Sequence, residues 1–109
     1  METNSSKILK RLGITPYASE AIKLDDGKIL ITYHGNGIAL INPCNMEVKI
    51  SNAGWYTPTT KKRINQVLSA LKTGVRVYQK GYIWYYDFNG FEFDYYNGGY
   101  FAYEHNPLL

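Results

Sequence analysis

The sequence predicts an α+β fold in which antiparallel β-meanders form a sheet packed by one main helix. Most of the chain divides into short strand-like segments whose links have hairpin length, which leaves no room for crossover helices. One longer segment has the periodicity of an amphipathic helix. The 11 Tyr, 4 Phe and 2 Trp residues also favour strands. The expected element order is β-β-β-α-β-β-β(β), within a single domain of residues 1–109.

The N-terminal region has the weakest pattern of the chain. Residues 1 to about 10 are polar and predict a loose lead-in to the domain. A short helix is also compatible with residues 7–22. Its apolar anchors would be Ile8, Leu12 and Ile22.

Three strands are expected before the main helix. Residues 28–33 and 37–41 flank the sequence HGNG at residues 34–37, whose members tolerate positive φ angles and predict a hairpin turn. Residues 46–51 alternate between apolar and polar side chains, which is the pattern of a strand with one buried face.

The main helix is predicted over residues 58–73. Thr57 supplies a capping hydroxyl, and Pro58 suits the first helical position because its φ is already helical and its missing N–H would be unpaired there. Gly74 provides a left-handed stop. Trp55 precedes the cap and is expected to pack between the end of the sheet and the start of the helix. The apolar stripe of this helix consists of Ile64, Val67, Leu68 and Leu71.

Four strand-like segments follow the helix, at residues 75–80, 82–88, 91–96 and 100–103. They are separated by Lys-Gly and Asn-Gly pairs, which favour tight turns. The segment 82–88 carries aromatic side chains at both odd and even positions, so that we expect both of its faces to be covered.

Charge is unevenly distributed along the chain, whose formal net charge is +3. Residues 47–80 carry seven Lys and Arg residues and one acidic residue, whereas residues 81–109 carry four acidic residues and no Lys or Arg. Such asymmetry is compatible with a nucleic-acid footprint, or with two halves that complement each other within one fold.

No catalytic or cofactor-binding signature is present in the sequence. Cys44 is the only cysteine, so that neither an intrachain disulfide nor a cysteine-based metal site is expected. His34 lies in a tight turn, where tolerance of the turn explains it more readily than a role as general base. No stretch approaches the roughly 20 apolar residues that a membrane span needs. We therefore expect a cytosolic, non-enzymatic protein without cofactor or metal.

Several short motifs form a recognisable pattern. Residues 54–65 read Gly-Trp-x-Thr-x-Thr-Thr-Lys-x-Arg-x-Asn, and His-Gly-Asn precedes them at residues 34–36. Val-Tyr-Gln-Lys follows at residues 77–80 and Trp-Tyr at residues 84–85. Over residues 33–86 the chain therefore resembles a widespread group of small bacteriophage proteins. The resemblance implies a phage origin, an accessory role in the cytosol of the host cell, and no catalytic residue.

The acidic, aromatic C-terminal region is the first candidate for a binding surface. It would suit a basic protein surface, because its charge imitates that of a nucleic acid and tyrosine gives contact area at low entropic cost. The partner would be a host or defence protein, as for an inhibitor of a nucleic-acid-targeting system such as an anti-CRISPR or anti-restriction protein. The predicted partner-binding residues are Tyr86, Asp87, Glu92, Asp94 and Tyr96.

The alternative is a nucleic-acid-binding module that uses the basic face of the main helix. Lysine and arginine donors suit phosphate contacts with DNA or RNA, and the start of a helix adds a positive dipole. A solvated helix face is the more frequent explanation of such a run of charges. The residues of this alternative site are Lys61, Lys62, Arg63 and Lys72.

Overall fold

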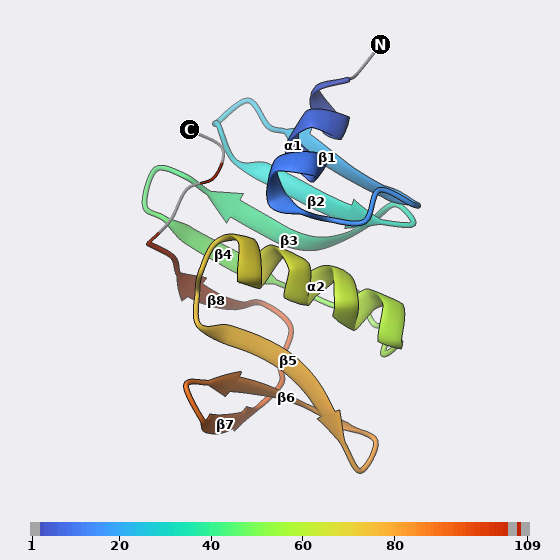
Figure 1. Cartoon of the computed structure of the whole chain (residues 1–109), viewed down its shortest axis with the longest axis vertical. Helices are drawn as coiled ribbons and strands as arrows, with labels where there is room; N and C mark the ends of the chain where they lie inside the picture. The colour runs from blue at the N-terminus through green and yellow to red at the C-terminus, as the bar shows by residue number, and fades with distance from the viewer. Residues whose placement is uncertain (1–2, 105–106, 108–109) are drawn as a thin grey trace.

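The computed structural model describes residues 3–104 and residue 107, and it confirms the α+β class. In this part of the chain, eight strands form two antiparallel sheets and two helices pack against them (Figure 1). The first sheet has the strand order β1-β2-β3-β4-β8, and the second has the order β5-β6-β7. The elements are α1 (Asn4–Leu12), β1 (Ser19–Lys23), β2 (Ile29–Tyr33), β3 (Asn36–Asn42), β4 (Glu47–Ile50), α2 (Pro58–Ala70), β5 (Val75–Lys80), β6 (Ile83–Phe88), β7 (Phe91–Asp94) and β8 (Gly99–Ala102).

The structure corrects the predicted lead-in and confirms the predicted short helix in part, with its anchors Ile8 and Leu12. Helix α1 occupies most of the expected lead-in, and its start is capped by the Thr3 hydroxyl, which accepts a hydrogen bond from Ser6 N at 3.1 Å. Leu9 and Leu12 of α1 are buried in the core. The rest of the expected helix contains strand β1, in which Ile22 is 41% exposed rather than an anchor. Apolar residues over so short a segment do not distinguish helical spacing from strand alternation.

The last strand joins the first sheet instead of extending the second. β8 pairs antiparallel with β4, so that Ile50 stands opposite Gly99 and Val48 opposite Phe101. A hydrogen bond of 2.8 Å from Gly98 N to Ile50 O continues this ladder. The meanders are thus divided between two sheets, a division that the sequence pattern did not predict.

Helix α2 begins as predicted and ends earlier. Thr57 Oγ1 accepts a hydrogen bond from Thr60 N at 3.2 Å, and a proline fills the first helical position. The helix ends at Ala70 rather than at residue 73, because Lys72 has a φ angle of 54° and so leaves the helical backbone.

Helix α2 contacts strands of both sheets and supplies the centre of the core (Figure 1). The predicted apolar stripe is confirmed, because all four of its side chains are buried. From the second sheet, the side chains that face this core are Val75, Val77, Trp84 and Tyr86. On the opposite face Ile83 is exposed, and Tyr82 in the preceding turn is exposed as well. The expectation that segment 82–88 is covered on both faces is therefore wrong.

Trp55 does not pack between the sheet and the helix, as its position before the cap had predicted. It is 57% exposed, and it stands in a turn closed by a 2.8 Å hydrogen bond from its backbone N–H to Asn52 O. The neighbouring Tyr56 contacts the core instead, with its ring centroid 5.1 Å from that of the buried Trp84.

Candidate functional site

The acidic residues of the C-terminal region lie on one face of the second sheet, which we call the outer face. Cross-strand pairing places Asp87 between Arg76 of β5 and Glu92 of β7, and it places Tyr85 opposite Asp94. The outer face consists of Arg76, Tyr78, Lys80, Ile83, Tyr85, Asp87, Glu92 and Asp94. The structure therefore brings together three of the five predicted partner-binding residues, namely the three carboxylates.

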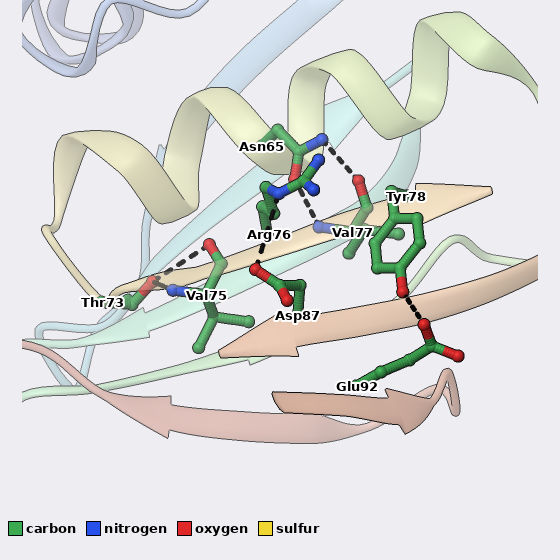
Figure 2. A network of polar contacts seen from close by, with 8 residues as sticks. All are labelled: Asn65, Thr73, Val75, Arg76, Val77, Tyr78, Asp87 and Glu92. Atoms are coloured by element: carbon green, nitrogen blue, oxygen red, sulfur yellow. Dashed lines mark hydrogen bonds and ion pairs between the residues drawn. The ribbon is translucent and has the colours of Figure 1, made fainter. Parts of the chain in front are cut away.

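Basic residues of β5 neutralise two of these carboxylates. Arg76 Nε lies 3.6 Å from Asp87 Oδ2, and the phenol of Tyr78 donates a hydrogen bond to Glu92 (Figure 2). Lys80 Nζ lies 3.2 Å from Glu92 Oε2. Asp94 has no ion-pair partner among the described residues. The negative charge that this face leaves for a partner is therefore concentrated at Asp94.

The hydrogen bond between Tyr78 and Glu92 shifts the pKa of both groups. It raises the pKa of Tyr78 to about 12, because loss of the phenolic proton would bring two anions together. The same bond, followed by the one from Lys80, lowers the pKa of Glu92 below its ordinary value of 4.5. At neutral pH, Tyr78 is therefore a neutral hydrogen-bond donor and Glu92 is ionised.

Strand β7 is an edge strand, and all four of its residues are exposed. Within the described ranges it pairs with β6 and with no other strand. Phe91 is 69% and Phe93 is 43% exposed, and both lie on the sheet face opposite to Glu92 and Asp94. Phe93 lines a groove of about 570 Å³, and residues of both sheets contribute to it, including Phe88, Tyr100 and Phe101. β7 therefore presents an aromatic side, an acidic side and an unpaired backbone edge.

The two tyrosines of the predicted partner site do not belong to the outer face. Tyr86 is fully buried, and its Oη donates a hydrogen bond to Tyr96 O at 2.9 Å. Burial raises the pKa of Tyr86, because the ionised phenol would be desolvated. Tyr96 is exposed, but it follows β7 and its ring meets that of Tyr86 edge-on at 5.8 Å. Tyr86 is therefore a core residue, because it lies with Trp84 on the face of β6 that contributes to the hydrophobic core.

Arg63 does not belong to a solvated basic face. It is 4% exposed, and its guanidinium donates from Nε to Ser19 Oγ and from Nη2 to Tyr17 O, both at 3.2 Å. The same group lies 4.8 Å from the centre of the Tyr33 ring. The prediction that Arg63 contacts phosphates is thus wrong, because its position beside the buried Ile64 turns it towards β1 and β2.

The three lysines of the alternative site are also dispersed. Lys61 is half-buried, with Nζ 3.5 Å from Gln79 Oε1 and 5.8 Å from the centre of the Trp84 ring. Lys62 is exposed on α2, whereas Lys72 is exposed beyond the end of this helix. The four basic residues of the alternative site therefore do not form one continuous face.

A cavity of about 320 Å³ lies at the start of α2, and the sequence patterns did not reveal it. Several of its lining residues belong to the motifs at residues 34–36 and 54–65 that resemble phage proteins. The lining residues are Tyr33, His34, Asn36, Ile38, Asn52, Trp55, Thr57, Thr59 and Thr60. Sequence reasoning assigned His34 to a turn and the threonines to a helix cap, and it did not single out Asn52. The cavity was missed because three segments that are separate in the sequence meet there.

The described residues carry no further site of a familiar kind. Among them, no three His, Cys, Asp or Glu side chains gather closely enough to hold a metal ion. In the same ranges, no helix is both long and apolar enough to cross a membrane. Cys44 is a free thiol at the surface.

Comparison with known proteins identifies a family. The model of the Kyanoviridae Gp96 protein family matches residues 17–102, which is more than half of the chain. The matched range runs from the residues before β1 to the end of β8, so that it includes both sheets, α2 and every residue that lines the cavity. No curated protein and no solved structure matches the chain.

Proposed function

We propose that this chain, which belongs to the Kyanoviridae Gp96 family of phage proteins, acts by non-catalytic binding to a protein of the host or of its defence systems. The observation that carries the proposal is strand β7, whose residues are all exposed. Two aromatic side chains and two carboxylates occupy its opposite sides, and one of its backbone edges is unpaired within the described chain. Exposed edges of this kind are sites at which another chain can add a strand.

Aromatic contact area is available next to this edge. Phe91 and Phe93 are exposed, and Phe93 lines a groove that also reaches the edge strand β8, the last strand of the first sheet. Large aromatic side chains are enriched among the residues that contribute most to protein interfaces. A partner segment added to β7 would place alternate side chains into this groove.

The charge of the same strand selects the partner. Glu92 and Asp94 face the side opposite to the phenylalanines, and Asp94 has no counter-charge among the described residues. A basic surface, such as the nucleic-acid channel of a defence enzyme, would be attracted to them. The protein would then act as an inhibitor of a nucleic-acid-targeting system, in the manner of an anti-CRISPR or anti-restriction protein.

Direct binding of DNA or RNA is the less supported function. Arg63 is buried in the core and Lys61 is half-buried. The exposed residues of the proposed basic site are therefore Lys62 and Lys72. A protein that neutralises few phosphates binds nucleic acid weakly at physiological salt.

The experiment is capture of host and defence proteins on immobilised protein, with a variant of β7 and a matched variant elsewhere. Phe91→Ser combined with Asp94→Lys should abolish capture of any specific partner, because it removes aromatic area and reverses the unpaired charge. Glu20→Lys is the control, since Glu20 is an exposed acidic residue of the other edge strand of the first sheet, β1. The Glu20→Lys variant should capture the partner as the wild type does.

Two outcomes would contradict this assignment. Capture that survives in the β7 variant, with circular dichroism showing that the variant is folded, would place the partner surface elsewhere. Absence of any captured partner, together with salt-sensitive gel shifts of DNA or RNA that disappear with Lys62→Ala and Lys72→Ala, would favour the nucleic-acid function instead.

A further inference from the structure

The cavity at the start of α2 is built by three separate segments of the chain. One wall comes from the hairpin between β2 and β3, a second from the turn around Asn52 and Trp55, and a third from the threonines of the α2 cap. Its volume of about 320 Å³ is at the lower end of the range of roughly 300 to 1,000 Å³ that small-molecule sites occupy. A ligand of modest size would fit.

Asn52, which lines this cavity, carries an unpaired donor. The side chain is fully buried, and its Oδ1 accepts a hydrogen bond of 2.8 Å from Gly54 N, which fixes the orientation of the amide. The backbone N–H of Asn52 donates to Asn97 Oδ1 at 3.0 Å, and its carbonyl accepts from Trp55 N at 2.8 Å. The remaining group, Nδ2, has no acceptor among the described residues. Because an unsatisfied buried donor is costly, an occupant of this cavity gains by bringing an acceptor to it.

The rest of the lining offers neutral polar groups. Thr57 Oγ1 lies 2.9 Å from Thr60 Oγ1 and 3.3 Å from Thr59 Oγ1, so that three hydroxyls form one hydrogen-bonded row. Each hydroxyl both donates and accepts. None of the described lining residues is Asp, Glu, Lys or Arg. The cavity therefore suits a neutral ligand with both donors and acceptors.

Aromatic rings complete the lining. The rings of Tyr33 and His34 lie 4.4 Å apart, and the buried guanidinium of Arg63 supports the Tyr33 ring at 4.8 Å. Trp55 lines the cavity while more than half of its surface is exposed. An indole in this position is available to stack on a flat ligand.

We propose that this cavity binds a nucleobase, stacked on Trp55 and recognised at its edge by Asn52 Nδ2 and the threonine hydroxyls. A nucleobase is neutral and planar, and it carries ring or carbonyl acceptors beside its donors. An apolar ligand would leave Asn52 unsatisfied, and a charged ligand would meet no Asp, Glu, Lys or Arg side chain in the lining. A saturated sugar would bring many hydroxyl donors to a lining that has no carboxylate to accept them.

The base can come from a free nucleoside or from a single strand of DNA or RNA, because both present the same edge. A strand would add phosphate contacts, for which Lys62, exposed on the following turn of α2, is a basic candidate. The inference does not depend on the protein-binding role of β7, which lies in a different sheet.

The test is calorimetric titration of the intact protein with adenosine, guanosine, cytidine and thymidine, and with a short single-stranded DNA of mixed sequence. The wild type should bind at least one nucleoside with a Kd below about 1 mM. Trp55→Ala should weaken that binding by about tenfold or more through loss of stacking. Tyr82→Ala, which removes an exposed aromatic residue outside the cavity, should leave binding unchanged.

Asn52→Asp tests the recognised edge of the base. It keeps an oxygen for Gly54 N and replaces the unpaired donor by an acceptor, so that the preferred nucleoside should change from one that presents an acceptor to one that presents an amino donor. If this variant does not fold, the Trp55→Ala comparison decides the question. If Lys62→Ala weakens binding of the strand but leaves nucleoside binding unchanged, nucleic acid is the source of the base.

Either of two results would overturn the proposal. The first is that no nucleoside and no strand binds the wild type below about 1 mM. The second is binding that Trp55→Ala leaves at the wild-type level, since the contact would then lie outside the cavity.

Discussion

The side chain of Asn65 and the backbone of Val77 are joined by two hydrogen bonds. Asn65 Nδ2 donates to Val77 O at 2.8 Å, and Val77 N donates to Asn65 Oδ1 at 2.7 Å (Figure 2). Val77 lies on β5, an edge strand of the second sheet, so that an amide on α2 takes the place that a neighbouring strand would have. Asn65, the last residue of the motif at residues 54–65, thereby attaches the second sheet to the helix.

Asn65→Ala should therefore destabilise the fold by about 2 to 3 kcal/mol, because it leaves a backbone donor and a backbone acceptor of Val77 unpaired. Ser69→Ala, at an exposed position of the same helix, should change stability by less than about 0.5 kcal/mol. Urea unfolding of the two variants measures both values. Equal small losses would show that the amide does not hold β5 in solution.

Arg63→Lys should lower the free energy of unfolding by about 2 kcal/mol or more, although it preserves the charge. Lysine cannot donate in the two directions needed for Ser19 Oγ and Tyr17 O, and it leaves a compact charge in a buried site. Lys62→Arg is the matched control at an exposed position, and thermal unfolding compares the two. A neutral effect of Arg63→Lys would indicate that the guanidinium is exposed in solution.

Leu68→Ala should cost about 2 to 5 kcal/mol, since this side chain is fully buried in the core. Lys62→Ala should cost less than about 0.5 kcal/mol, because the lysine is exposed on the same helix. A denaturant titration of each variant distinguishes the buried stripe of α2 from its exposed face. Similar losses at both positions would contradict the placement of these faces.

Acidification should weaken the fold through Glu92. Its pKa is lowered in the folded state, first by the hydrogen bond from Tyr78, so the unfolded chain takes up a proton at a higher pH than the folded chain does. This contribution to stability is fully present above the ordinary value of 4.5 and is lost as the pH falls through the lowered pKa. The melting temperature of Glu92→Gln should therefore fall less between neutral and acidic pH than that of the wild type. Parallel decreases in the two proteins would exclude this linkage.

Gly99→Ala should destabilise the junction of the two sheets by about 1 to 3 kcal/mol. A Cβ atom at this position would lie 2.9 Å from Tyr86 Oη and 3.3 Å from Tyr86 Cζ, and this tyrosine is fully buried and cannot move aside. Gly37→Ala is the control, because its Cβ would meet the flexible end of the Leu30 side chain at 3.1 Å. Thermal unfolding should show the smaller loss at Gly37.

Local sequence patterns were sufficient for the elements that depend on neighbouring residues. The start of α2 follows from Thr57 and the proline after it, because a cap involves backbone groups within one turn. The common face of Asp87, Glu92 and Asp94 follows from strand alternation and a two-residue hairpin. The α+β class and the acidic part of the candidate surface could be predicted in this way.

The exposure of individual side chains required knowledge of what covers each face. Arg63 is buried because Tyr17, Ser19 and Tyr33 supply two acceptors and a ring on its side of α2. Tyr86 is buried because Tyr95, Phe101 and the backbone at Gly99 pack around it. Trp55 is exposed because the core contact is made by Tyr56. No pattern within a few residues of these positions carries that information.

The pairing of β8 with β4, and with it the division into two sheets, depends on residues distant in the sequence. Ile50 and Gly99 meet although 48 residues separate them, and the cavity at the start of α2 likewise joins segments near residues 34, 52 and 59. Local backbone preferences act over a turn or a hairpin, whereas the choice among distant pairings is made by the burial of apolar surface in the whole chain. That burial, rather than any motif, gathers the residues of the cavity.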